Sequence, residues 1–408
     1  MNSNPVDAAA RLDSSEARLM RAEPAPRLRF GLEREWAFAA MLAAYGVIYL
    51  AWYPATYTIS DEGDYIVLAR AIWHGTIFVD RAGAFWGLPF GRHLVSKYSA
   101  FHAALLAPAF AVDWRLMFLV AAGFFILGAF ILRGIYRRRG LGSGWCLLYF
   151  MLAGGLYYSQ TVMAAVPAAV MGLAGVALCL RDPPRPLLAG FAFGASILLH
   201  PWMGPLAAMF GLVWSIEQGR AGIARAAGYL ALGVLPAALA IMTYNIATTG
   251  SPFQDVYTAL GSQYEFTGER LPGFFYFYAL SFAIFPIAGW SAFWRRFSGT
   301  WAIAATCALG LAMCSLYFFR DGLRTGSASI GSFAFLAGGI PGQRFLLPIS
   351  TIACIPAARF LSAIALRIPV RLRSAARVAA VVAFAIFFAG LSFTHSSYIR
   401  ALSPSASL

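Results

Sequence analysis

Apolar runs of about 20 residues recur along the whole chain and are separated by short polar segments that contain arginine. Runs of this length are typical of helices that cross a lipid bilayer, whose hydrocarbon core is about 30 Å thick. A membrane barrel would show short segments of alternating apolar and polar residues instead, and the sequence lacks that alternation. The pattern therefore predicts an all-α polytopic membrane protein.

We expect about 11 transmembrane helices. They are predicted over residues 36–53, 116–132, 144–159, 161–180, 187–200, 202–216, 226–246, 273–291, 299–318, 344–366 and 378–394. The two short runs on either side of His200 and Pro201 leave a broken or re-entrant helix as an alternative at that point.

The first polar interruption is long and spans residues 54–115. It contains too many charged and histidine side chains to lie in the hydrocarbon. Within it, residues 101–112 are apolar but too few to cross a bilayer, and they include His102 and Pro108. We expect this stretch to be a helix on the membrane surface, with a true span as the alternative.

Composition supports a membrane protein and excludes several other classes. The chain has 408 residues, of which 60% are hydrophobic and only 12% are charged, whereas a soluble globular protein has about 25% charged residues. The net charge of +14 does not indicate nucleic-acid binding, because the arginines are spread over short loops and form no basic stripe. All five cysteines fall within predicted spans, which predicts neither a loop disulfide nor a metal site.

The distribution of basic residues predicts an orientation. With the N-terminus in the cytoplasm, the cytoplasmic segments carry twice as many basic residues as the opposite segments, as the positive-inside rule requires. Residues 1–35 are then a cytoplasmic tail and residues 36–394 the transmembrane domain. Residues 54–115 form a long outer loop, and residues 395–408 are an outer tail.

An acidic cluster opens the predicted outer loop. Asp61, Glu62 and Asp64 follow the first span within four residues. Three charges at the bilayer centre would cost about 8–10 kcal/mol, so the cluster must lie outside the hydrocarbon. A carboxylate there can accept a proton from an attacking hydroxyl, and a second one can orient it or hold a divalent cation such as Mg²⁺ or Mn²⁺. Helix capping and solvation are the alternative explanation.

The order of motifs around this cluster resembles the GT-C superfamily of polyprenyl-phosphate-sugar glycosyltransferases, which includes lipid A aminoarabinose transferases and protein O-mannosyltransferases. The stretch "SDEGDY" follows the first span, and "SKYSAFHAALLAP" precedes the second. The resemblance implies a catalytic carboxylate at Asp61 and a donor-phosphate contact at Lys97, the only lysine in the chain. It also implies an active site on the periplasmic side of a bacterial-type inner membrane.

Further segments match the resemblance in the same order. They are "YYSQTVMAAVPAAV", "GFAFGASILLHPWMGPL", "YNIATTGSPFQDVY" and "GQRFLLP". Two positions depart from the family's pattern. Ala165 stands where many relatives have an acidic residue, which puts a second acidic group in doubt. His200 stands where many have arginine or lysine, so a fixed positive charge is uncertain there, because histidine titrates near neutral pH.

The candidate residues fall into three groups. Asp61, Glu62 and Asp64 are the candidate catalytic or metal-binding residues. Arg92, Lys97 and Arg344 are candidate phosphate-binding residues, although Arg344 could instead be an interfacial anchor. The candidate substrate-cavity residues are Tyr65, Tyr98, His102, His200, Tyr244 and Asn245.

The sequence therefore predicts a hexosyl- or pentosyltransferase. It would move a sugar from a polyprenyl-phosphate donor to a hydroxyl on a glycolipid, a polysaccharide or a protein. The alternative is a secondary transporter or a lipid flippase. A transporter would place ionisable residues near the membrane midplane and show repeated halves, and the sequence shows neither feature.

Overall fold

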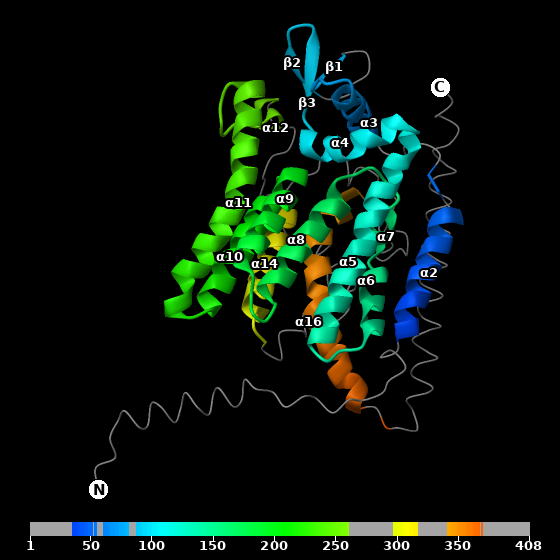
Figure 1. Ribbon diagram of the computed structural model, residues 1–408, viewed down its shortest axis with the longest axis vertical. Helices are drawn as coiled ribbons and strands as arrows, with labels where there is room; N and C mark the ends of the chain where they lie inside the picture. Colours follow the sequence, from blue (N-terminus) through cyan, green and yellow to red (C-terminus); the bar gives the residue numbers. More distant parts are fainter. Residues whose placement is uncertain are drawn as a thin grey trace, which may run out of the picture.

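The protein was analysed as a computed structural model, which describes residues 35–51, 53–54, 60–80, 87–260, 297–316, 341–367 and 369. The described part is a bundle of apolar helices with a layer of short helices and strands at one end (Figure 1). We call this end the α3 end, after the helix that carries the acidic cluster. The predicted spans over 273–291 and 378–394, the tail over 1–34 and the tail over 395–408 lie outside the described residues.

Most predicted spans are helices in the structure. They are α2 (Glu35–Ala51), α5 (Phe118–Arg138), α8 (Ala165–Cys179), α9 (Pro186–Leu199), α10 (Met203–Glu217), α11 (Arg220–Thr249), α14 (Thr300–Leu316) and α16 (Leu347–Arg367). Three stretches of the described chain, Trp114–Arg138, Arg220–Thr249 and Arg344–Ala365, are long and apolar enough to cross a membrane by themselves. The shorter apolar helices complete the bundle, as expected for a polytopic membrane protein.

The predicted span over 144–159 is not one continuous helix. It is divided into the 3₁₀ helix η4 (Ser143–Cys146), α6 (Leu147–Phe150) and α7 (Ala153–Tyr158). Leu152 adopts an extended conformation that separates α6 from α7. The adjacent Gly154–Gly155 pair weakens helix formation, and Gly155 lies where an added Cβ would meet the Phe125 ring. The apolar run predicted one continuous helix over 144–159, and the structure shows a broken one.

Small residues let the longest helix approach its neighbour closely. Helix α11 packs along α9, where Gly190 and Gly194 face Gly233 and Ala237. A Cβ atom at Gly190 or Gly233 would collide with the opposing backbone. Close packing of this kind is typical of helices in membranes, where small interfacial residues replace the hydrophobic effect as the basis of association.

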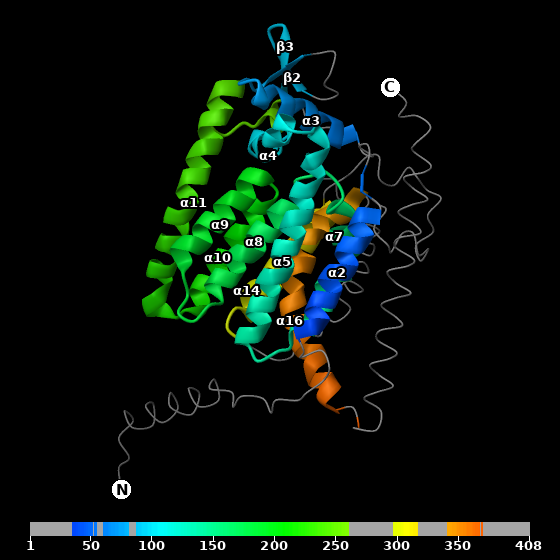
Figure 2. The same cartoon turned by 45° about the vertical axis from the view of Figure 1, so that its right-hand side comes forward.

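The layer at the α3 end contains a small sheet, which corrects the all-α prediction. Strands β1 (Phe78–Asp80), β2 (Gly87–Phe90) and β3 (His93–Ser96) form an antiparallel sheet in the order β1-β3-β2. Asp80 lies opposite His93, and its exposed carboxylate is 3.3 Å from Nδ1 of His93. Figure 2 shows the sheet projecting beyond α3 (Ser60–Trp73), away from the bundle.

The predicted surface helix is present as a short helix followed by a 3₁₀ turn. Helix α4 (Ala100–Leu106) continues into η2 (Ala107–Ala111), and Pro108 lies in the first turn of η2. Together they span too few residues to cross a bilayer. The buried side of α4, including Ala103 and Leu106, packs against α3. Helix α4 therefore holds α3 against the end of the bundle.

Candidate functional site

Helix α3 directs its first two turns toward the bundle. Asp61, Asp64, Tyr65 and Leu68 share one face because they are three or four residues apart. Tyr65 and Leu68 are buried, and Asp64 is only 2% exposed. Carboxylates this deeply buried need nearby positive charge or hydrogen-bond donors. Two cations, Lys97 and Arg344, supply the charge.

Asp61 forms an ion pair with an arginine from the far end of the sequence. The Nη1 group of Arg344, in η6 (Pro341–Leu346), donates a hydrogen bond of 2.9 Å to Oδ2 of Asp61. The two side chains are 10% and 17% exposed, so water screens the pair only weakly. Tyr98 lies near this carboxylate, and burial together with the charge of Asp61 raises the pKa of Tyr98.

Lys97 lies at the same cluster, directly after strand β3. Its ammonium group is 5.1 Å from the centre of the Tyr98 ring and 5.6 Å from that of Tyr257, at distances typical of cation–π contacts. Burial lowers the pKa of Lys97, the charges of Asp61 and Asp64 oppose that change, and Arg344 reinforces it. Lys97 therefore faces two carboxylates and a second cation.

Glu62, the residue after Asp61 on α3, holds the loop that follows α7. Its side chain is completely buried, and Oε2 accepts a hydrogen bond of 3.0 Å from the backbone N–H of Val162. The carbonyl of the same residue contacts Nε2 of His102 at 2.8 Å. Val162 is thus bound through both backbone groups, by α3 and by α4, and this clamp fixes the α7–α8 connection beside the site.

The clamp determines which nitrogen of His102 carries the proton. A carbonyl only accepts hydrogen bonds, so Nε2 must be the protonated nitrogen and Nδ1 is left as an acceptor. Nδ1 is buried and has no hydrogen-bond partner in the described part of the chain. Burial lowers the pKa of His102 to about 4, which keeps the ring neutral at physiological pH. The ring stacks edge-on against Tyr65, with centroids 4.9 Å apart, and Tyr65 contacts Tyr98 at the same separation.

The side chain of Arg344 packs against an aromatic ring. The Arg344 guanidinium carbon is 5.1 Å from the centre of the Phe345 ring. Trp202 and His200, in the turn between α9 and α10, contact the other parts of that ring at centroid distances of 5.3 and 6.4 Å. His200 is therefore a supporting residue of Arg344 in this structure. Its Nδ1 accepts a hydrogen bond from the backbone N–H of Trp202 at 3.3 Å.

Three other candidates lie apart from the cluster. Arg92 is exposed in the β2–β3 turn. Strand β3 separates it from Lys97, and the five residue steps between the two would span about 16 Å in an extended chain. Asn245, near the end of α11, donates a hydrogen bond of 3.2 Å to the carbonyl of Pro252 and so braces the chain that returns toward α12 (Val256–Ala259). Tyr244 packs against Phe101, with ring centroids 6.1 Å apart.

The arrangement does not fit a divalent cation held jointly by Asp61 and Glu62. Such an ion needs oxygen ligands that converge at about 2.0–2.6 Å. Asp61 instead pairs with Arg344, and the Glu62 carboxylate contacts the Val162 backbone. Within the described ranges, no group of three or more His, Cys, Asp or Glu side chains gathers as a metal site would require. We therefore assign no chemical step to a metal.

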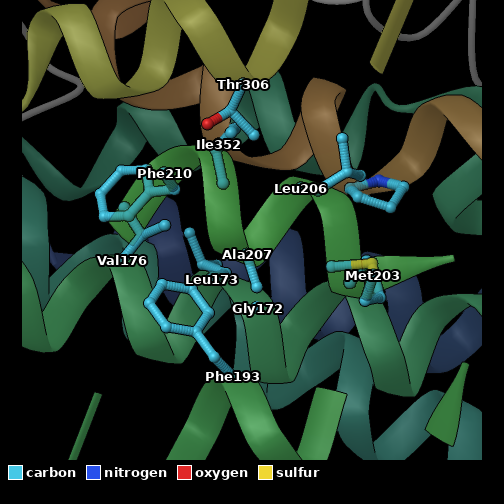
Figure 3. Close-up of a pocket in the computed structure, with 12 residues that line it drawn as sticks. Gly172, Leu173, Val176, Phe193, Met203, Leu206, Ala207, Phe210, Thr306 and Ile352 are labelled. Atoms are coloured by element: carbon cyan, nitrogen blue, oxygen red, sulfur yellow. The ribbon is translucent and has the colours of Figure 1, made fainter. Parts of the chain in front are cut away.

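An apolar cavity lies within the bundle near this site. Figure 3 shows Met203, Leu206 and Phe210 of α10 around it, with Phe193 of α9 on one side and Ile352 of α16 on another. Its volume is about 20 Å³, little more than one water molecule needs. The Thr306 hydroxyl donates to the carbonyl of Ala302 in its own helix, at 2.7 Å. The lining therefore offers contacts suited to an apolar group.

The bundle of apolar helices and the layer of short helices and strands at its α3 end define a polytopic helical membrane protein. In particular, the structure is similar to two crystal structures of ArnT from Cupriavidus metallidurans, one in the apo state and one bound to undecaprenyl phosphate. ArnT is a lipid A aminoarabinose transferase of the GT-C class. Each comparison has a TM-score of 0.55 and 14% sequence identity, and covers 90% of this chain and 73% of ArnT. No protein-family model and no curated protein sequence matches the chain.

Sequence reasoning missed several participants in this site, among them Tyr257 and Val162. Tyr257 reaches Lys97 from α12, and Val162 contributes only its backbone. A backbone N–H and a carbonyl are present in almost every residue, so no sequence signal could have selected Val162. The segment "YNIATTGSPFQDVY", which ends at Tyr257, was a signal for the first of these, but the sequence did not indicate which of its residues would contact the site.

Proposed function

We propose that the protein is a glycosyltransferase that takes a sugar from a polyprenyl-phosphate donor and transfers it to an acceptor hydroxyl. The observation that carries the proposal is the cluster of Asp61, Arg344 and Lys97 at the α3 end of the bundle. It places a carboxylate that can accept a proton beside two cations that can receive a phosphate. The similarity of the fold to ArnT, one of whose structures contains undecaprenyl phosphate, supports the donor class.

In this proposal, Asp61 accepts the proton of the acceptor hydroxyl. The hydroxyl oxygen forms a new bond to the anomeric carbon of the donor sugar while the bond from that carbon to the phosphate oxygen breaks. The electron pair of the broken bond leaves with the polyprenyl phosphate. Lys97 and Arg344 stabilise the charge that develops on this leaving group, and preorganised cations stabilise the transition state more than the ground state.

The donor phosphate and Asp61 would then compete for Arg344. Before the donor binds, the guanidinium neutralises the carboxylate at 2.9 Å. A phosphate is a strong bidentate partner for arginine, so its arrival would draw Arg344 away from Asp61. The freed carboxylate could then accept a hydrogen bond from the acceptor hydroxyl and take its proton. Donor binding would in this way make the base available.

The experiment is an in vitro transfer assay with the purified full chain. Its components are a panel of radiolabelled polyprenyl-phosphate sugars and membrane lipid, glycan and protein fractions as acceptors. We expect the labelled sugar of one donor to be transferred to one of the acceptor fractions. Asp61→Asn should lower that rate by about 10²–10⁴-fold, the usual contribution of a general base. Asp80→Asn is the matched control, because Asp80 is an exposed carboxylate on β1. Equal rates in Asp61→Asn and the parent would refute the assignment of the base.

A further inference from the structure

A cluster of arginines occupies the end of the bundle opposite α3. Arg138 and Arg139 end helix α5, Arg181 follows α8, and Arg359 comes from the second half of α16. Figures 1 and 2 both show α5 and α16 running from the α3 layer toward the far end of the molecule. Arg138 and Arg181 are close enough to repel one another, and so are Arg139 and Arg359.

Two of these arginines share one aromatic ring. The guanidinium carbon of Arg139 is 4.5 Å from the centre of the Phe297 ring, and that of Arg359 is 5.5 Å from the same centre. The N–H of Phe297 donates to the hydroxyl of Thr300, which donates in turn to the carbonyl of Phe297, both at 2.7 Å. Phe297 is thereby fixed at the start of α14 and holds two like charges together.

This concentration of positive charge has an electrostatic cost. Burial, together with the charges of Arg359 and Arg138, lowers the pKa of Arg139 to about 10. An anion that contacts both guanidinium groups would reduce the repulsion between Arg139 and Arg359.

The length of α5 places this cluster at the depth of lipid headgroups. Its 21 residues extend about 32 Å at 1.5 Å per residue, close to the thickness of the hydrocarbon core of about 30 Å. Leu127 and Phe130 of α5 are about 45% exposed, as expected of a helix that faces lipid. The charged end of α5 is therefore positioned to meet the phosphates of one leaflet.

We propose that Arg139 and Arg359, assembled on Phe297, bind the phosphate of an anionic phospholipid in the leaflet opposite the Asp61 site. Arginine suits this role because its planar guanidinium can bind two phosphate oxygens and stack on an aromatic ring at the same time. Basic pockets between helices at the headgroup level are a recurrent form of lipid recognition. This site would anchor the inner ends of α5, α14 and α16 independently of sugar transfer.

Native mass spectrometry of the delipidated full chain tests the proposal, with phosphatidylglycerol, phosphatidylcholine and inorganic phosphate as probes. We expect retained phosphatidylglycerol and little phosphatidylcholine. An arginine near the headgroups contributes about 1 kcal/mol to the binding of an anionic lipid. Arg139→Gln or Arg359→Gln should therefore weaken phosphatidylglycerol binding about fivefold, and the double variant should weaken it about 25-fold. Arg220→Gln is the matched control, since Arg220 is an exposed arginine at the beginning of α11. It should change binding less than twofold.

The unfolding temperature of each variant distinguishes a loss of lipid binding from a loss of folding. Each variant removes one of two repelling charges, so its unfolding temperature in lipid-free detergent should remain close to that of the parent. Only the increase in unfolding temperature on addition of phosphatidylglycerol should shrink. Unchanged phosphatidylglycerol binding in the double variant would overturn the proposal. So would competition by millimolar inorganic phosphate, because the cluster would then be a site for soluble anions. If the Gln variants do not fold, Arg139→Lys and Arg359→Lys keep the charge and should still lower the affinity, since lysine lacks the planar fork.

Discussion

The Nη1 group of Arg344 donates to Oδ2 of Asp61 across 283 residues of sequence, and both side chains are largely shielded from water. This pair joins the first helix of the α3 layer to the beginning of α16. It is both a structural link and the centre of the proposed active site. Because the two roles coincide, the consequences for folding and for transfer have to be measured separately.

Removing Arg344 should destabilise the protein more than removing both members of the pair. Arg344→Met leaves Asp61 buried without its partner, and breaking a buried pair in this way costs about 3–5 kcal/mol. In Arg344→Met with Asp61→Asn, no carboxylate charge remains uncompensated, so part of the loss should be recovered. Thermal unfolding of the four proteins in one detergent gives the coupling energy. If the losses of the two single variants add up to the loss of the double variant, the interaction between Asp61 and Arg344 contributes nothing to the free energy of unfolding.

Transfer should follow a different pattern in the same variants. Arg344→Lys keeps the charge but loses the bidentate geometry for a phosphate, so it should retain stability better than activity. We expect the donor concentration at half-maximal rate to rise in Arg344→Lys, with a smaller fall in the maximal rate. An unchanged dependence on donor concentration would place the phosphate elsewhere.

Glu62 should be important for the structure of the site and not for its chemistry. Glu62→Ala leaves the buried N–H of Val162 without an acceptor, which should lower the free energy of unfolding by about 1–3 kcal/mol. Glu62→Gln keeps an oxygen acceptor and should lose less. If the carboxylate were the base, Glu62→Gln would lower transfer as strongly as Asp61→Asn while leaving the unfolding temperature nearly unchanged. Parallel measurement of both quantities distinguishes the two roles.

The sequence predicted the elements whose signal is local. Apolar length predicted α5, α11 and α16, and the concentration of charge predicted that Asp61 and Lys97 lie at one end of the bundle, where the structure brings them together. The strands of the small sheet escaped prediction because they have only three or four residues each. Their stability comes from pairing with other segments. The hydrogen bonds of Val162 to Glu62 and His102 were not predicted, because Val162 makes them with its backbone groups.

The same limit applies to the candidate phosphate-binding residues. Arg92 and Arg344 looked alike in the sequence, since each is a basic residue on the predicted outer side, Arg92 in the long loop and Arg344 at the outer end of a span. The structure separates them: Arg344 contacts Asp61, whereas Arg92 is exposed in a turn. Proximity in the folded protein depends on how η6 and the β2–β3 turn pack, and the hydropathy pattern contains no information about that packing.

His102 should make stability depend on pH in a defined window. Its pKa is lowered from 6.5 to about 4 in the folded state, so the unfolded chain binds the proton more tightly. Stability from this residue is fully present above about pH 6.5 and is lost as the pH falls toward 4. At pH 5 the loss is about 2 kcal/mol. His102→Gln can still donate to the Val162 carbonyl but cannot titrate there. Unfolding in denaturant at pH 5 and pH 7.5 should show a smaller difference for this variant; an equal difference would exclude His102 as the cause.

Lys97 should set the alkaline limit of transfer, because only its protonated form can stabilise a leaving phosphate. Burial lowers its pKa, with Arg344 acting in the same direction against Asp61 and Asp64. The rate should therefore fall on the alkaline side at a lower pH than an ordinary lysine with a pKa of about 10.4 would give. Lys97→Arg keeps a charge that does not titrate in this range, so the alkaline fall should move to higher pH even though the maximal rate is reduced. Lys97→Met should abolish most transfer at every pH while the protein remains folded. Initial rates from pH 6 to pH 10 at saturating donor test this directly, and identical pH profiles for the parent and Lys97→Arg would remove Lys97 from the titration and from the phosphate site.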